Sequence, residues 1–533
     1  MDADGKIKRA VNAQALATEI DSNVVSNPDE CWLFTWPGKS EAIASANSPC
    51  DKLIVPCREK SVDFDNTKNI YIEGDNLDAL KILRTSYKGQ VKMIYIDPPY
   101  NTGNDIVYHD SFNRHNVGKG SSWLSMMYPR LKLARDLLTE DGVIFISIGE
   151  TEVAPLRIIC EEIFGDSNFI TDFIWKKKGV STNVKNVMAS TLTEHILCFS
   201  KTSVPCLNRR RTSPQTRKYP CHDDLGNYRT TIIEKKDAGD YARRTMKFEI
   251  LGTKPREGKR WQIGEDKARE LEKANRFVFD QGMVKLKIYD FEDNDTFSAN
   301  PNLLLDYGST ESACKYLYTE IFKAQEVFPN PKPMELMRHL LNMGSNPDSI
   351  VLDFFSGSAT TAHALLELNR IDGGHRRFIT VQLPEPCGTD TEAYKAGFMN
   401  ISDLGLERLR IASKLLPTRN FDFGFRMFRM TSPSSDLNAS ELIWHIGSLL
   451  GFPLDVSITL GVFDSISYWA VDGGKAIICL EEAGVNIAGI LEKYKPLWFV
   501  SQKGKNTDII GIIADLHLET KVFSLPEILA GKS

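Results

Sequence analysis

The sequence contains no apolar stretch of the roughly 18 residues that a membrane-spanning helix needs. The longest candidate, residues 442–454, is short and interrupted by Gly447, Gly451 and Pro453. The first ten residues, MDADGKIKRA, lack the apolar core of a secretory signal. Ten cysteines are present, but no two of them form a CxxC pair, and a disulfide framework is not expected in so large a chain. These absences predict a cytoplasmic protein with reduced thiols and no membrane contact.

Two nucleotide-binding signatures are also missing. No glycine-rich loop leads into Lys followed by Ser or Thr, so the chain has no helicase-type P-loop, and no GxGxxG loop indicates a dinucleotide site. Cys221 and His222, with Cys198 and Cys206 upstream, fit no zinc-finger spacing. We therefore expect no metal centre.

The composition is ordinary for a globular protein, but the charge is unevenly distributed. The 533 residues are 42% hydrophobic and 25% charged, a length that allows three or four domains. A net charge of −5 conceals a basic segment, residues 201–260, with 16 Lys and Arg against 7 Asp and Glu. Such a segment is typical of a module that meets a polyanion, although a solvated charged face gives the same pattern.

Short apolar runs alternate with amphipathic helices in two parts of the sequence, which predicts a parallel α/β sheet. Near-continuous apolar strands, expected to be buried on both faces, occur at 91–96, 143–148, 349–355 and 378–383. The alternation fades in between, as it would for an insertion, and the tail shows short alternating strands of a small α+β domain. The expected organisation is an N-terminal segment 1–65, a core 66–200 and 326–416, an insertion 201–325 and a C-terminal domain 417–533.

The sequence Asp97-Pro98-Pro99-Tyr100 follows one of these strands. Ligands of open α/β sheets bind beyond the carboxyl ends of the strands, so this motif stands where chemistry is expected. The prolines restrict the backbone, Asp97 offers acceptor oxygens and Tyr100 offers a flat aromatic face. Together they predict a pocket for a planar group that carries an amine.

A second motif, DFFSGSATT at residues 353–361, lies between a predicted strand and a helix. Gly357 permits a close approach of the backbone, and the start of the helix offers unpaired N–H groups. One glycine alone is also compatible with a tight turn. A small cofactor without a pyrophosphate fits this loop best.

Taken together and in this order, the motifs resemble those of the beta-class amino-methyltransferases of DNA, and more closely the modification subunit of type III restriction–modification systems. The resemblance covers about residues 32–415 apart from the insertion. It is carried by YIEGDNLDALKIL, VKMIYIDPPYNTGND, FPNPKP, DFFSGSATTAHALLELN and VQLPEP. It implies a circularly permuted, Rossmann-like methyltransferase sheet with an inserted target-recognition domain.

The resemblance also implies roles for individual residues. Asp97 and the Pro98 carbonyl would bind the amine of a flipped-out base, beside Pro99, and Tyr100 would stack on it. An aspartate at the first position favours adenine N6, since relatives that act on cytosine N4 more often begin with serine. Ala359 stands where the wider class usually has a second glycine. The cofactor S-adenosylmethionine would be bound by Asp75, Asn76, Lys332, Pro333, Asp353, Phe354, Phe355, Ser356, Gly357, Ser358, Gln382 and Glu385.

The insertion would recognise duplex DNA through its basic residues. For any one of them, a phosphate contact or plain solvation is commoner than readout of a base. The expected DNA contacts are Lys176, Lys177, Arg209, Arg210, Arg211, Arg217, Arg243 and Arg244.

The sequence therefore predicts a site-specific adenine-N6 DNA methyltransferase, the modification and recognition subunit of a type III system. The family implies a homodimer and a separate helicase–nuclease restriction subunit. Three alternatives stay open: an orphan adenine methyltransferase, an inactive DNA-binding assembly subunit and an RNA methyltransferase. His363 is expected to be a packing or surface residue, the aromatics of FDFGFRMFRM to lie in a core or interface, and residues 110–120 to form a lid or a long loop.

Overall fold

The structure is a computed structural model with two compact units. The inserted unit comprises Asn208–Pro301, and the core unit comprises the residues on either side of it. No helix among the described residues is long and apolar enough to span a membrane. Residues 110–120 lie outside the described part of the chain. The described residues are 34–102, 122–180, 189–239, 242–323, 327–415, 421–433, 438–481, 485–502 and 507–529.

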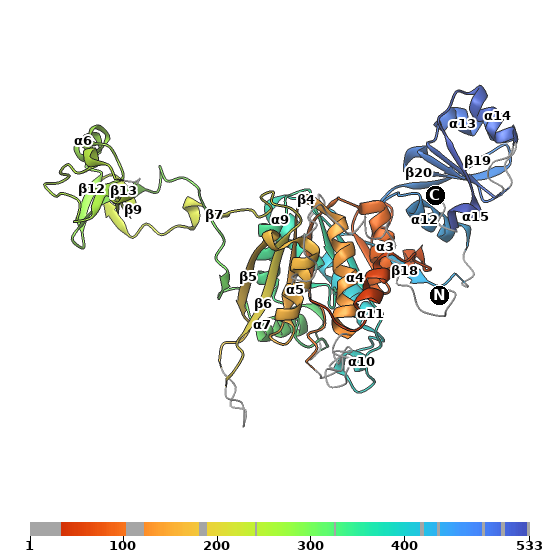
Figure 1. The fold of residues 1–533 in the computed structure, drawn as a ribbon, viewed down its shortest axis with the longest axis horizontal. Helices are drawn as coiled ribbons and strands as arrows, with labels where there is room; N and C mark the ends of the chain where they lie inside the picture. The colour runs from red at the N-terminus through yellow and green to blue at the C-terminus, as the bar shows by residue number, and fades with distance from the viewer. Residues whose placement is uncertain are drawn as a thin grey trace, which may run out of the picture. The chain divides into compact units, whose positions relative to one another are not determined.

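A ten-stranded sheet organises the core unit (Figure 1), in the order β1-β18-β2-β17-β16-β3-β4-β6-β5-β15. The six strands from β18 to β4 are parallel, whereas β6 is antiparallel to both of its neighbours. The parallel sheet expected from the apolar runs is thus confirmed at its centre. The strands are β1 Leu53–Pro56, β2 Ile70–Glu73, β3 Val91–Ile96, β4 Leu138–Ile148, β5 Phe169–Lys176, β6 Thr193–Ser200, β15 Leu303–Leu304, β16 Ile350–Asp353, β17 Arg377–Gln382 and β18 Arg426–Thr431.

Helices cover both faces of this sheet, because alternate residues of each central strand enter different apolar clusters. Ile94 and Ile96 of β3 pack with α3, α4 and α5, whereas Met93 and Tyr95 pack with α8, α9 and α11. Burial on both faces explains why the strands are almost continuously apolar. The helices are α3 Asn76–Tyr87, α4 Ser122–Leu137, α5 Val153–Phe164, α8 Met334–Gly344, α9 Thr360–Asp372 and α11 Ile401–Leu415, with α2 Lys39–Asn47 against α4 and α7 Thr310–Tyr316 beyond β15.

The C-terminal segment begins inside the central sheet. β18 comes from the FDFGFRMFRM segment and pairs with β1 and β2, so Phe425, Met427 and Phe428 are core residues. The expected boundary at residue 417 therefore falls before a strand of the core. The rest forms a five-stranded sheet with its own apolar clusters. Its elements are α12 Ala439–Leu449, β19 Ile458–Phe463, β20 Ile466–Val471, β21 Ala476–Ile478, α13 Ala488–Tyr494, β22 Trp498–Ser501, α14 Thr507–Asp515, β23 Lys521–Ser524 and α15 Leu525–Leu529.

The inserted unit lies within the segment 201–325 that the sequence indicates. A four-stranded antiparallel sheet, β12-β13-β9-β8, packs with α6 around a small core that includes Trp261 and Phe277. Two ribbons of two strands each, β7–β14 and β10–β11, complete the unit. Its elements are β7 Arg210–Thr212, β8 Cys221–Asp223, β9 Gly226–Ile232, β10 Glu234–Lys236, β11 Lys259–Trp261, α6 Glu265–Lys273, β12 Phe277–Asp280, β13 Met283–Tyr289 and β14 Thr296–Ser298.

A buried arginine joins the central sheet to the chain that leads into the C-terminal sheet. Arg426 is 4% exposed and donates to the carbonyls of Thr67 (3.0 Å), Leu454 (3.2 Å) and Val456 (2.7 Å). Its guanidinium also lies 5.4 Å from the ring centre of Trp444. Burial lowers the pKa of Arg426 from its ordinary value. Thr67 and Leu454 are buried and Val456 is half-buried, so these carbonyls accept the guanidinium where few other donors reach them.

We expect Arg426→Met to lower the free energy of unfolding by about 3 kcal/mol, because it leaves buried carbonyl acceptors without a donor. Urea denaturation followed by circular dichroism measures this change. Arg84, one-third exposed and 3.7 Å from Asp136, offers the matched control. Arg84→Met should change stability by no more than about 0.5 kcal/mol. Equal effects of the two substitutions would show that the buried hydrogen bonds contribute nothing.

Candidate active site

Four neighbouring parallel strands place polar residues at one edge of the central sheet. Gln382 ends β17 and Asp353 ends β16, while Asp75 follows β2 and Asp97 follows β3. Because these strands are parallel and adjacent, their carboxyl ends meet at the same edge. A cavity of about 310 Å³ lies there, and all four residues line it.

The cavity brings together most of the residues expected at a cofactor site, and Asp97 and Pro99 of the other motif also line it. The expected cofactor residues in its wall are Asp75, Asn76, Lys332, Asp353, Phe354, Phe355, Ser356, Gly357, Ser358, Gln382 and Glu385. Pro333, also expected at the cofactor site, is not among the residues that line this cavity. It caps α8 with φ −67°, and its carbonyl accepts the N–H of Met337 at 3.1 Å.

The loop after β16 is held in a tight turn from two sides. Gly357 and Ala359 both have left-handed backbone angles, with φ of 51° and 58°. The Gln382 side chain accepts the N–H of Gly357 at 2.7 Å. Arg408, fully buried on α11, donates to the Ser358 hydroxyl at 2.9 Å and to Nδ1 of His363 at 3.2 Å. His363 is therefore a packing residue, one of the two roles expected for it.

Arg130 of α4 is a wall residue that the motifs do not reveal. Its guanidinium is 3.0 Å from a carboxylate oxygen of Asp75 and donates to the side chain of Asn76. Asn76 in turn donates to the Phe354 carbonyl at 2.7 Å, which links the turn after β2 to the loop after β16. One signal was available in the sequence: Arg130 interrupts the apolar stripe formed by Trp123, Met127 and Ala134.

Lys332 contacts the Asp97–Tyr100 turn directly. Its ammonium lies 2.7 Å from an oxygen of Asp97 and 3.0 Å from the Tyr100 hydroxyl. The other Asp97 oxygen accepts the Tyr100 hydroxyl at 2.8 Å. Behind Lys332, at 3.4 Å, stands Glu194 of β6, which also pairs with Lys177 at 3.1 Å. Sequence reasoning missed Glu194, because no local pattern distinguishes a glutamate at the start of a strand.

Burial and these ion pairs set the charges at the motif. Burial raises the pKa of Asp97, and the opposing effect of Lys332 reduces that rise. Burial opposes the charge on Lys332, but Asp97 and Glu194 together hold the pKa of Lys332 above its ordinary value. Lys332 and Lys177 outweigh the burial of Glu194, so the pKa of Glu194 is lowered. The ammonium of Lys332 thus stays charged between two carboxylates.

Residues of other elements hold the Asp97–Tyr100 turn in place. The fully buried indole of Trp123 donates to the Pro99 carbonyl at 2.7 Å. Asn101 has a left-handed φ of 56° and donates to the buried Glu152 at 2.7 Å. Gly149 faces the Tyr100 ring so closely that a Cβ there would lie 3.1 Å from it. These contacts leave the turn little freedom to move.

Asp353 gives the cavity an uncompensated acidic group. It is 3% exposed, and its oxygens accept the Phe355 N–H at 3.1 Å and the Thr361 hydroxyl at 2.5 Å. Burial raises the pKa of Asp353 to about 7. No cation among the described residues pairs with it, whereas Asp75 and Asp97 each have one. A ligand that carries positive charge beside apolar and aromatic parts suits this wall, which also contains Phe328, Phe354 and Phe355.

A parallel α/β sheet with a cofactor-sized acidic cavity and an adjacent Asp-Pro-Pro-Tyr turn defines a class of protein, the amino-methyltransferases. Comparison with known proteins supports this class. A family model described as DNA methylase matches residues 91–385. The chain belongs to this DNA methylase family, and its methyl donor is S-adenosylmethionine.

Type III modification subunits are among the curated relatives of the chain. The chain is 33% identical to the type III restriction–modification enzyme StyLTI Mod subunit of Salmonella typhimurium over 74% of this chain and 66% of that protein. It is 29% identical to the EcoP15I Mod subunit of Escherichia coli over 79% and 75% of the two chains. It is 32% identical to the type II methyltransferase M.KpnI of Klebsiella pneumoniae over 66% and 90%. The resemblance to type III modification subunits is confirmed.

The basic residues expected to contact DNA differ in their exposure and in whether they form an ion pair. Arg209, Arg210 and Arg243 are exposed, and Lys176 is half-buried. Arg211 pairs with Asp295 at 2.7 Å, and Lys177 pairs with Glu194 behind the catalytic motif. Lys177 is therefore part of the charge network that Glu194 forms with Lys332 and Asp97. The side chain of Arg244 lies outside the described residues.

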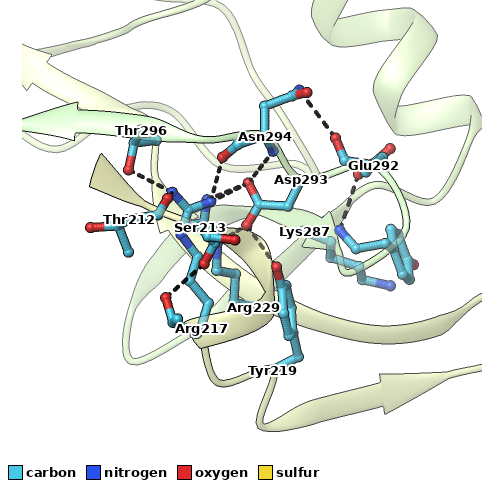
Figure 2. Close-up of polar contacts among 12 residues, drawn as sticks. Thr212, Ser213, Arg217, Tyr219, Arg229, Lys287, Glu292, Asp293, Asn294 and Thr296 are labelled. Atoms are coloured by element: carbon cyan, nitrogen blue, oxygen red, sulfur yellow. Dashed lines mark hydrogen bonds and ion pairs between the residues drawn. The ribbon is translucent and has the colours of Figure 1, made fainter. Parts of the chain in front are cut away.

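Arg217, expected at the DNA surface, has a side chain that is only 9% exposed within the inserted unit. Figure 2 shows its guanidinium beside Asp293, at 2.7 Å, with further hydrogen bonds to the carbonyls of Thr212 and Asn294. Arg229 and Tyr219 converge on the same carboxylate. Arg229 and Arg217 hold the pKa of the Asp293 carboxyl well below its ordinary value. Both terminal nitrogens of Arg217 are engaged within the unit, so Arg217 ties the β7–β14 ribbon to the rest of it.

We expect the affinity for S-adenosylmethionine to fall about tenfold for each pH unit below about 7, because a protonated Asp353 no longer attracts a cation. Above that pH the carboxylate is already ionised, and the affinity should level off. Isothermal titration calorimetry at several pH values measures this dependence, and binding at about pH 6 should release protons. Asp353→Asn should bind weakly with a flat pH dependence. A wild-type affinity that does not change between about pH 5.5 and 7 would contradict the assignment.

Proposed function

We propose that this site transfers a methyl group from S-adenosylmethionine to N6 of adenine in duplex DNA, in the modification and recognition subunit of a type III restriction–modification system. The single observation that carries the proposal is the shared cavity of Asp97 and Asp353 on adjacent strands. Lys332 orients the carboxylate of Asp97, which would bind the amine. The carboxylate of Asp353 would attract the positive charge of the cofactor. The intact Asp97–Tyr100 turn does not favour an inactive assembly subunit.

The protein's contribution to the reaction is mainly positioning. When bound, S-adenosylmethionine supplies an electrophilic methyl group on its sulfonium sulfur. The amine of adenine is a poor nucleophile, because its lone pair is delocalised into the ring. Asp97 and the Pro98 carbonyl would accept its two hydrogens and favour a pyramidal nitrogen with its lone pair directed at the methyl group, and Tyr100 would stack on the base. Extruding the base from the duplex costs a few kcal/mol.

Lys332 would serve the substrate side of this cavity. Its ammonium holds Asp97 ionised and oriented, which the acceptor role requires. After transfer the methylated nitrogen is positively charged and must lose one proton. Asp97 is the adjacent acceptor, and the pKa of Asp97, raised by burial, suits it to receive that proton before passing it to water.

The proposal extends to the partners of this subunit. Duplex DNA would be recognised by the inserted unit, and cleavage would need a separate helicase–nuclease restriction subunit, as the relatives' type III naming suggests. We further propose a homodimer and a cytoplasmic location.

Expression in a methylation-free host should produce N6-methyladenine within one short asymmetric sequence, and none in a parallel Asp97→Ala strain. Single-molecule sequencing of the host DNA measures both. Methylation at cytosine N4 would overturn the base assignment and leave the mechanism standing. No methylation by well-folded protein, with or without a restriction subunit, would overturn the enzymatic role.

We expect Lys332→Gln to move the acid limb of the pH–rate profile upward by at least about one unit, because the pKa of Asp97 rises when its neighbouring cation is removed. The turnover number should fall on the order of tenfold or more, with little change in cofactor affinity. Lys201→Gln is the matched control, since Lys201 is another largely buried lysine and pairs with Glu140, outside the network of Asp97 and Glu194. An unchanged acid limb in Lys332→Gln would remove Lys332 from the substrate side.

A further inference from the structure

Arg408 of α11 is a buried cation without a carboxylate partner. It is 1% exposed and forms no ion pair with any residue that the structure describes. Glu367, whose charge acts on Arg408, already pairs with Arg338 at 2.7 Å. Arg376, which is buried to a similar degree, lies 2.9 Å from Asp372. Burial lowers the pKa of Arg408 only to about 10, so the guanidinium stays charged at neutral pH and its charge is uncompensated.

The guanidinium of Arg408 binds the wall of the cofactor cavity without lining the cavity itself. One terminal nitrogen donates to the hydroxyls of Ser358 at 2.9 Å and Thr360 at 2.7 Å, and both of these residues line the cavity. Because arginine can only donate, each hydroxyl accepts from it and has its own hydrogen directed elsewhere. The two hydroxyl oxygens are 3.3 Å apart, so one hydrogen can be shared between them. The other hydrogen is available to an acceptor in the cavity.

The second buried arginine outside an ion pair, among the residues described, has no such outlet. Arg426 donates to backbone carbonyls, which have no hydrogen to pass on. Arg408 therefore differs from Arg426 in that its charge reaches a cavity through hydroxyl groups.

The start of α9 combines this cation with an acid. Asp353, which lacks a cationic partner in the described part of the chain, accepts the hydroxyl of Thr361 at 2.5 Å, and Arg408 binds the neighbouring Thr360. S-adenosylmethionine carries two opposite charges at its amino-acid end, where an ammonium and a carboxylate share one carbon atom. The cations of the cavity wall, Arg130 and Lys332, are already paired with carboxylates. Arg408 is thus the cation left to offset the carboxylate of the cofactor.

We propose that Arg408 is a positioning residue for the carboxylate of S-adenosylmethionine, which the hydroxyls of Ser358 and Thr360 would bind. Arg408 would direct their hydrogens into the cavity and supply the positive charge behind them, without touching the cofactor. A charge-assisted arrangement of this kind is stronger than hydroxyl contacts alone. The inference rests on the proposed function, whose cofactor it assumes, and adds to it a residue of α11 that lies outside the sequence motifs.

Isothermal titration calorimetry of the full chain tests this role with two ligands, S-adenosylmethionine and its decarboxylated analogue. The analogue keeps the ammonium and the sulfonium and lacks only the carboxylate. The parent chain should bind the analogue on the order of thirtyfold more weakly, as expected for the loss of charge-assisted hydrogen bonds. In Arg408→Met the ratio of the two affinities should fall below about fivefold, because the carboxylate no longer gains from the buried charge. A residue that only supports the fold would weaken both ligands equally and leave the ratio unchanged.

Arg376→Met is the matched control, since Arg376 is equally buried but precedes β17 at the end of that strand opposite the cavity. Its affinity ratio should stay at the parent value. If Arg408→Met does not fold, Thr360→Val removes one of the two hydroxyls and should lower the ratio by about threefold or more. An unchanged ratio in the folded variant, or a larger loss of the ratio in Arg130→Met than in Arg408→Met, would overturn the inference. A parent chain that shows the expected ratio but leaves DNA unmethylated would overturn the proposed function and not this inference.

Discussion

The ion pair between Lys332 and Asp97 is the interaction on which the rest of the site depends. In the proposed reaction Asp97 accepts hydrogens from a neutral amine and is buried with the base, and burial by itself favours its neutral form. The protein offsets that cost with one ammonium at 2.7 Å and then stabilises the ammonium with a second carboxylate, Glu194. Lys177 completes the alternation of charge. A buried network of this kind is stable only as a set, because removal of one member leaves another uncompensated.

This network also explains the arrangement of the polypeptide. Asp97 follows β3, whereas Lys332 precedes α8, on the other side of the inserted unit in sequence. The two residues meet because β16 pairs with β3 in the centre of the sheet, and α8 packs on the face of the sheet that carries Met93 and Tyr95 of β3. The cofactor wall has the same dual origin, with Asp75 and Asn76 from before the insertion and the loop after β16 from beyond it.

The central sheet and the loops of the site could be predicted from the sequence. The residues that could not be predicted have one property in common. Strands buried on both faces and loops at their carboxyl ends are local patterns, so periodicity and turn residues predict β3, β16 and the loops after them, whereas the roles of the loop residues come from the family resemblance. Glu194, Trp123 and Arg130 bind partners that are distant in the sequence. No pattern in the neighbouring residues predicts those partners. The same limit affected Lys177 and Arg217, whose charge suggested DNA until their carboxylate partners were placed. Pro333 belonged to a matching motif, yet its local chemistry is that of a helix start.

The way the two ends of the inserted unit are held together determines the entropic cost of the insertion for the core sheet. β7 and β14 pair with each other near the two points where the chain enters and leaves the unit, and Asn300 donates to the Asn208 carbonyl at 2.8 Å. Loop-closure entropy depends on how far apart the ends of a segment must be held and how many flexible residues join them. Here the unit's own strands hold those ends side by side. An interruption of 94 residues therefore costs the surrounding sheet little more entropy than a short hairpin would.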